Sequence, residues 1–189
     1  MSSGFPPPER RSPPPLAARW IAHFRMERIP QEQAWFAPAY RSDEQLPRAP
    51  GGRYAGQRDL SNSIHCVITR EDFSALHRLA TDELWHIYAG SPLEMLLLYP
   101  DGRGETVVLG SDVLAGQRPQ FCVPRGVWQG ARPVEGDEAC TLLGNSMAPA
   151  FDYADFEIGY REELQRQYPA FAPMIAELTR AGHLRRPPA

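Results

Sequence analysis

The sequence contains no hydrophobic run long enough to cross a membrane. A bilayer-spanning helix needs about 20 consecutive apolar residues. The longest run here, residues 93–99, has the length of a strand and is interrupted by Glu94. Residues 1–15 are mainly Pro, Ser and Arg and lack the apolar core of a secretory signal. We therefore expect a cytoplasmic protein that makes no contact with membranes.

An excess of positive charge is also absent. The 20 basic and 23 acidic residues give a net charge of -3 without a basic patch, so we expect no nucleic-acid partner.

CxxC pairs are missing as well. Cys66, Cys122 and Cys140 each lie in an apolar, β-like run, which predicts buried, reduced thiols. The sequence has no glycine-rich phosphate loop and no nucleophile elbow.

Two tails flank a single predicted domain. Residues 1–15 contain six prolines and almost no apolar side chains, so they cannot bury enough surface to fold and are predicted to be disordered. Residues 185–189 form a similar, shorter tail. A chain of 189 residues then leaves room for one domain over residues 16–184.

Short apolar or β-branched runs, separated by Gly, Pro and Asp, follow one another through the middle of the chain. This rhythm, without helix-length segments between the runs, predicts an antiparallel all-β sandwich or barrel. Pro100-Asp101-Gly102 predicts a hairpin between two of the strands. The predicted strands are residues 64–69, 84–89, 93–99, 105–109, 120–123 and 139–143, followed by a late strand over 156–160.

Helical periodicity is confined to the two ends of the domain. Apolar residues at helical spacing over residues 16–24 predict a short amphipathic helix. Two more helices are predicted over residues 161–168 and 173–180, the second closed by Gly182. Residues 41–60 are rich in Pro, Gly and Arg and predict a surface loop.

The segment around His77 resembles the first signature of the cupin superfamily. That signature is a His, a second His two residues on, a Glu four residues further and a Gly seven residues after the Glu. Here His77, Glu83 and Gly90 fall on matching positions, whereas Leu79 stands in place of the second His. The resemblance implies a cupin double-stranded β-helix, a jelly-roll barrel, with short flanking helices at both ends.

A later segment resembles the second cupin signature. Gly116 and Pro124-Arg125-Gly126 match its glycine and Pro-x-Gly elements, with two extra residues before the proline. Gln129 stands where the signature has its last His. The two segments lie on either side of the predicted hairpin, as the strand pairs of the family require.

The resemblance is closest to small bacterial and fungal cupins of unassigned function, and it spans residues 20–168. It is carried by three segments: Tyr40-Arg41-Ser42, Asp82-Glu83-Leu84-Trp85-His86 and Phe151-Asp152-Tyr153-Ala154-Asp155-Phe156. The sequence departs from this branch at Gln33-Ala34, where a glycine pair is usual, and at Pro38, where an acidic residue is usual. A role for this early loop is therefore not predicted.

Metal binding is the less favoured interpretation. A typical cupin holds a divalent transition metal with three His and one Glu, but only His77 and Glu83 are retained. A metal would need His77, Glu83, Gln129 and also His86. Because side chains alternate along a strand, His86 should point away from the face that carries Glu83 and Trp85, unless a bulge intervenes.

A metal-free pocket is the favoured interpretation. Glu83 would raise the basicity of His77, and the pair would act as a general base at a carbon next to a carbonyl. Metal-free sugar epimerases of the cupin fold work in this way with a Tyr as the opposing acid, for which Tyr88 and Tyr99 are candidates. The predicted ligand-binding residues are Trp85, Tyr99, Gln120, Phe121, Trp128 and Gln129.

The predicted function is that of a small-molecule-binding cupin, an isomerase or epimerase acting on a polar, sugar- or acid-like metabolite. Two alternatives stay open at this point. One is a non-catalytic ligand-binding or sensing module, because fold does not determine function. The other is a metal-dependent oxygenase or isomerase. The resemblance further implies a homodimer.

Overall fold

The computed structural model describes residues 12–47, 52–54, 56–134 and 136–187. Most of the predicted N-terminal tail and the last two residues of the predicted C-terminal tail lie outside the described residues. The two arginines at the start of the C-terminal tail do make contacts, since Arg185 pairs with Glu162 and Arg186 pairs with Glu163. Within the described ranges, no helix is long and apolar enough to span a membrane.

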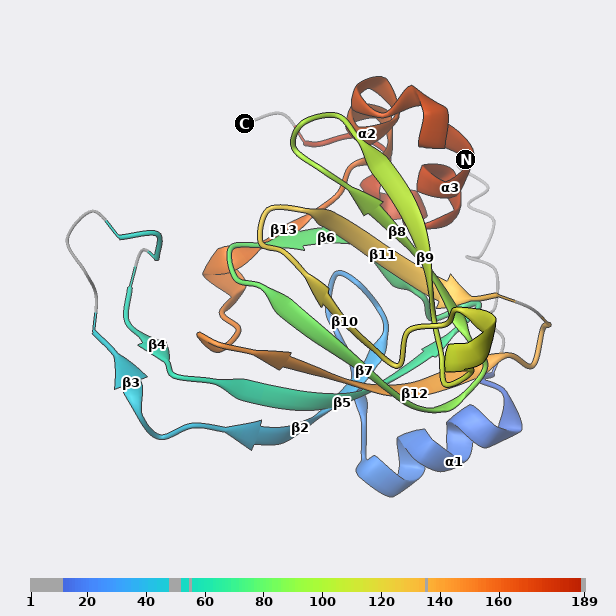
Figure 1. Cartoon of the computed structure of the whole chain (residues 1–189), viewed down its shortest axis with the longest axis horizontal. Coiled ribbons are helices and arrows are strands. Elements are labelled where there is room, and N and C mark those ends of the chain that lie inside the picture. The colour runs from blue at the N-terminus through green and yellow to red at the C-terminus, as the bar shows by residue number, and fades with distance from the viewer. Residues whose placement is uncertain (1–11, 48–51, 55, 135, 188–189) are drawn as a thin grey trace, which may run out of the picture.

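Two antiparallel sheets form the barrel (Figure 1). The six-stranded sheet has the order β1 (Glu27–Arg28), β2 (Trp35–Arg41), β5 (Asn62–Thr69), β12 (Cys140–Met147), β7 (Glu83–Gly90) and β10 (Gln120–Val123). The five-stranded sheet has the order β13 (Phe156–Ile158), β6 (Ser74–Leu79), β11 (Trp128–Pro133), β8 (Leu93–Leu98) and β9 (Gly104–Leu109). The chain crosses repeatedly from one sheet to the other, which is the predicted jelly-roll arrangement.

The core fills the space between the sheets, because alternate side chains of each strand point inward. Its members include Ile68 and Leu143 from the six-stranded sheet and Met95 and Leu97 from the five-stranded sheet, all buried. Trp85 belongs to the same cluster. This packing fills the middle of the barrel.

Helices cover the outer face of each sheet (Figure 1). Helix α1 (Pro15–Phe24) starts with a proline, which has no N–H group to satisfy at a helix N-terminus, and packs on the six-stranded sheet. Helices α2 (Arg161–Gln167) and α3 (Ala172–Glu177) pack on the five-stranded sheet through Leu164 and Ile175. Leu76 and Trp128 on the sheet complete this second apolar layer. Outer-face residues of the barrel are therefore buried as well as inner ones.

Six of the predicted strands are present as β5, β7, β8, β9, β10 and β12, and the predicted hairpin joins β8 to β9 with Gly102 at a φ of 90°. The prediction missed β2, β6 and β11, because each contains residues that are uncommon in strands. Pro38 lies beside a bulge in β2, and the pairing of β11 with β6 shifts after Gln129. In β6, His77 and Arg78 interrupt the apolar pattern.

Four further details of the prediction were wrong. The predicted loop over residues 41–60 contains a two-stranded ribbon, β3 (Gln45–Leu46) and β4 (Arg58–Asp59), too short and polar to give a periodic signal. The late strand ends at Ile158, just before a glycine. Gly182 lacks the positive φ of a helix cap, because α3 already ends at Glu177. Cys122 is exposed, since it points outward from the edge strand β10.

Candidate functional site

A cavity of about 270 Å³ lies between the sheets at the open end of the barrel. Strands β2, β5, β7 and β12 of the six-stranded sheet contribute to its walls, together with β6 of the other sheet, the β1–β2 loop and the segment before β13. Its lining residues are Ile29, Glu32, Phe36, Pro38, Tyr40, Arg41, Asn62, Ser63, Ile64, His77, Leu79, Glu83, Asn145, Met147, Phe151, Tyr153 and Phe156.

His77 forms the polar floor of this cavity. Strand β6 is paired on both sides, by β11 and β13, so the backbone of His77 is held by two neighbouring strands. Its Nδ1 donates to the carbonyl oxygen of Ala75 at 2.8 Å. The ring stacks on Phe156 with centroids 5.3 Å apart, and only 3% of the residue is exposed. The imidazole is therefore held in one orientation.

Two buried carboxylates flank the His77 ring. Glu83, the first residue of β7, places Oε2 at 3.9 Å from Nε2 of His77. Glu32, in the loop between β1 and β2, places Oε2 at 3.8 Å from Nδ1. Both glutamates are 7% exposed. The site is thus a Glu–His–Glu row, and Glu32 is a member that the sequence analysis did not find.

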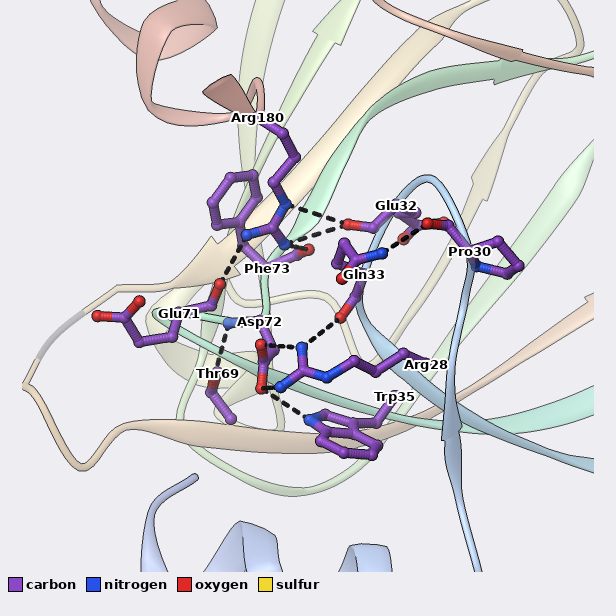
Figure 2. A network of polar contacts seen from close by, with 10 residues as sticks. All are labelled: Arg28, Pro30, Glu32, Gln33, Trp35, Thr69, Glu71, Asp72, Phe73 and Arg180. Atoms are coloured by element: carbon purple, nitrogen blue, oxygen red, sulfur yellow. Dashed lines mark hydrogen bonds and ion pairs between the residues drawn. The ribbon is translucent and has the colours of Figure 1, made fainter. Parts of the chain in front are cut away.

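Arg180 holds the loop that carries Glu32 (Figure 2). Its guanidinium donates to the backbone oxygen of Glu32 at 3.1 and 3.3 Å and to the backbone oxygens of Glu71 and Phe73, each at 2.7 Å. It also lies over the Phe73 ring, 3.5 Å from the centroid. One side chain that follows α3 therefore joins the loop to the turn between β5 and β6.

A second set of contacts holds the same loop from its other side (Figure 2). Asp72 accepts two hydrogen bonds from Arg28 and one from the indole N–H of Trp35 at 2.7 Å. Arg28 also donates to the backbone oxygen of Gln33 at 3.3 Å, and Gln33 adopts a φ of 75°. These contacts fix both ends of the loop, so the Glu32 side chain points toward His77 rather than toward solvent.

Gln129 and Trp85 hold Glu83 in place through a chain of hydrogen bonds. Gln129 lies directly across from His77 in β11, and its Nε2 donates to Oε2 of Glu83 at 2.6 Å. Its Oε1 accepts a hydrogen bond from the Trp85 indole at 2.9 Å. Both residues are buried and lie beneath the cavity, so they orient Glu83 rather than line the wall.

The family model described as Cupin superfamily (DUF985) matches residues 18–159. The chain belongs to this cupin family. Protein SO0799 from Shewanella oneidensis is similar to it, with 31% identity, a TM-score of 0.75 and coverage of 87% of this chain and 97% of that one. A hypothetical protein from Leishmania major is similar at 28% identity, with a TM-score of 0.75 and coverage of 86% and 98%. A search of curated proteins gave no match.

The three segments that resemble the small bacterial and fungal cupins converge on the cavity. Tyr40 and Arg41 come from the first, Glu83 from the second, and Tyr153 and Phe156 from the third. The early loop that departs from that branch also belongs to the site, because it carries Glu32 and is followed by the lining residue Pro38.

The donor set of this cupin does not fit a metal ion. Among the described residues, no group of three or more His, Cys, Asp or Glu side chains is arranged to hold one. Leu79 stands at the position of the second His and carries no donor atom. Both ends of the Gln129 amide are engaged, by Glu83 and Trp85, and Nδ1 of His77 is bonded to a backbone oxygen. These side chains can therefore serve proton transfer without a metal ion.

Interactions within the Glu–His–Glu row determine which of its members carry a charge. Burial alone lowers the pKa of His77, but the carboxylates of Glu32 and Glu83 reverse this effect and raise it to about 9. Burial raises the pKa of Glu32, although the neighbouring His77 opposes the rise. At neutral pH His77 is therefore a cation that holds its proton, and the sequence-based role of a neutral histidine base has to be reassigned.

Several predicted site residues lie away from the cavity. His86 points outward from β7 and bonds to Gln120 at 3.2 Å, as strand alternation required. Tyr88 is exposed on the same outer face. Tyr99 bonds to Glu105 at the β8–β9 hairpin. The two remaining aromatic candidates also lie elsewhere: Phe121 packs at the opposite side of the core, and Trp128 lies under the C-terminal helices. Tyr40 and Tyr153 are the tyrosines that line the cavity.

We expect the protonation of His77 to make the free energy of unfolding depend on pH. Its native pKa of about 9 exceeds the ordinary value of 6.5, so the stabilisation is fully present below pH 6.5 and is lost as the pH rises through 9. The raised pKa of Glu32 acts in the same direction. NMR titration of the histidine ring protons, with urea unfolding at several pH values, measures both effects. A His77 resonance that titrates near 6.5 would contradict the proposed charge state.

Proposed function

We propose that this cupin binds a small carbonyl compound and moves a proton at the carbon next to the carbonyl, as an isomerase or epimerase. The observation that carries the proposal is the buried His77 between two buried carboxylates at the floor of the cavity. Such paired groups with shifted pKa values are typical of proton-transfer sites. Sugar-like and acid-like metabolites are the candidate ligands.

The row supplies a base and a positive charge at the same point. Glu32, whose pKa burial raises, accepts the proton from carbon. The electron pair of the broken C–H bond moves toward the carbonyl oxygen, whose negative charge the His77 imidazolium stabilises. Return of the proton from Glu32 to the former carbonyl carbon, with the proton of the neighbouring hydroxyl passing to the former carbonyl oxygen, completes an isomerisation. Return to the opposite face of the same carbon gives an epimer and uses a second donor, for which Tyr40 and Tyr153 of the cavity lining are the candidates. Glu83, oriented by Gln129, keeps His77 charged.

Exchange of carbon-bound hydrogen with solvent tests this proposal. Purified protein is incubated in deuterium oxide with a panel of keto sugars, 2-oxo acids and cyclic ketones, and deuterium uptake next to the carbonyl is followed by mass spectrometry. We expect Glu32→Gln to reduce exchange by about 100-fold, which is the usual contribution of a general base. Glu94→Gln is the matched control, because Glu94 pairs with Arg132 outside the cavity.

The outcomes separate catalysis from binding. Exchange that requires Glu32 supports the proposal, whereas exchange that is equal in wild type and Glu32→Gln removes Glu32 from the mechanism. A panel compound that binds and is recovered without deuterium would instead favour a non-catalytic binding module. Native mass spectrometry of the freshly purified protein identifies such a bound compound directly.

A further inference from the structure

Asn145 carries an unused hydrogen-bond donor in the cavity wall. It lies on β12 with its side chain on the cavity face, directly across from Ile64 on one side and Trp85 on the other. The residue is 5% exposed, and its Nδ2 has no hydrogen-bond partner in the described part of the chain. A buried donor without a partner is unfavourable, so its retention points to an acceptor that comes from outside the chain.

Several other polar groups of the wall already have partners within the chain. Asn62 accepts from the backbone N–H of Phe151 at 2.8 Å, and the Ser63 hydroxyl bonds to Ser146 at 3.2 Å. Glu83 accepts from Gln129, as described above. Among the described residues, the other buried side-chain atoms without a partner belong to Ser74 and His183, neither of which lines the cavity. Among the described residues, Asn145 Nδ2 is therefore the buried side-chain donor of the cavity wall that has no partner.

The rest of the wall is mostly apolar. Its carbon surface comes from Ile29, Phe36, Ile64, Leu79, Met147, Phe151 and Phe156. A ligand with many hydroxyl groups would leave several of them unpaired against this wall, which is costly. A ring with an apolar face would instead gain from contact with the aromatic side chains.

We propose that the ligand is a ring-sized carbonyl compound whose oxygen accepts the hydrogen bond of Asn145 Nδ2 while an apolar face of the ring lies on the aromatic wall. This inference rests on the proposed function in one respect, that the cavity is the ligand site, and it narrows the candidate ligands to carbonyl compounds with few hydroxyl groups. Water can satisfy the Asn145 amide while the cavity is empty. A ligand that displaces this water must offer an acceptor in its place, so the amide selects carbonyl compounds over hydrocarbons of the same shape.

Two probes of nearly the same shape test the inference by calorimetric titration of the full chain. Acetophenone carries a carbonyl oxygen, and ethylbenzene replaces it with hydrogen. We expect acetophenone to bind wild type about tenfold more tightly, because ethylbenzene leaves the amide unpaired. In Asn145→Leu and Asn145→Ala the preference should disappear. Ser63→Ala is the control, since Ser63 belongs to the cavity lining but its hydroxyl is bonded to Ser146, and it should keep the preference.

Equal binding of the two probes to wild type, no binding of either, or a preference that survives in both Asn145 variants would overturn the inference. Two Asn145 variants are used so that a bulky replacement alone cannot produce the result. Deuterium uptake by acetophenone is measured in the same samples. Selective binding without uptake by any carbonyl compound would count against the proposed proton transfer and leave carbonyl recognition by Asn145 standing. Glu32-dependent exchange that is unaffected in the Asn145 variants would support the proposed proton transfer and count against carbonyl recognition by Asn145.

Discussion

Replacement of His77 by Gln should destabilise the protein by about 3–5 kcal/mol at pH 7, which is the usual cost of removing one partner from a buried ionic group. His77 is the cation between Glu32 and Glu83, and both carboxylates are almost completely buried. Without it, two like charges face each other with little water to solvate them. Urea unfolding of wild type and variant, with equal slopes, measures the loss.

The pH dependence and a double variant separate this charge effect from lost packing. At pH 5 the loss should be smaller, because Glu32, whose pKa burial already raises, takes up a proton more readily once the cation is gone. His77→Gln combined with Glu32→Gln should recover part of the stability, as expected for residues that interact directly. A loss that is the same at both pH values and strictly additive in the double variant would mean that His77 contributes by packing rather than by charge.

Local sequence chemistry was sufficient to predict most of the barrel. Strand β8 reads as an apolar run, interrupted by Glu94, because its leucines and Met95 are buried on both faces of the sheet. The turn around Gly102 allows a positive φ at low cost. Strands β2, β6 and β11 were missed because their sequences serve two purposes. They pair within a sheet and also carry Pro38, His77 or Gln129 at the site, so their apolar pattern is interrupted.

The site residues that could be predicted are those that lie within a sequence motif. His77 and Glu83 lie in one signature and meet because a short turn joins β6 to β7. Glu32 and Asn145 reach the cavity through contacts between segments far apart in the chain, and neither has a local signal. The predictions for Tyr88, Tyr99 and Trp128 were wrong for a different reason. In a barrel covered by helices both faces of a strand are apolar, so aromatic character alone does not tell which face is the pocket.

Arg180 is expected to act as a positioning residue for Glu32, and its removal should have the second largest effect. Arg180→Ala deprives three backbone oxygens, those of Glu32, Glu71 and Phe73, of charged donors, which should cost about 3 kcal/mol of stability. The pKa of His77 should also fall below its value of about 9. The cause is that the loop loses its anchor, so that the Glu32 carboxylate, which raises the pKa of His77, is no longer held against the ring.

The pKa of His77 distinguishes positioning from simple stabilisation, since a merely structural role would leave it unchanged. Arg132→Ala is the control, because Arg132 also joins the C-terminal helix to the barrel, through Glu177, without touching the loop. It should lower stability and leave the His77 titration in place. Arg180→Lys keeps the charge but cannot reproduce the fork of donors that anchors the loop, so it should restore the pKa of His77 only in part and recover little stability. An unshifted His77 in Arg180→Ala would show that the contacts from Arg28 suffice to hold Glu32 against the ring.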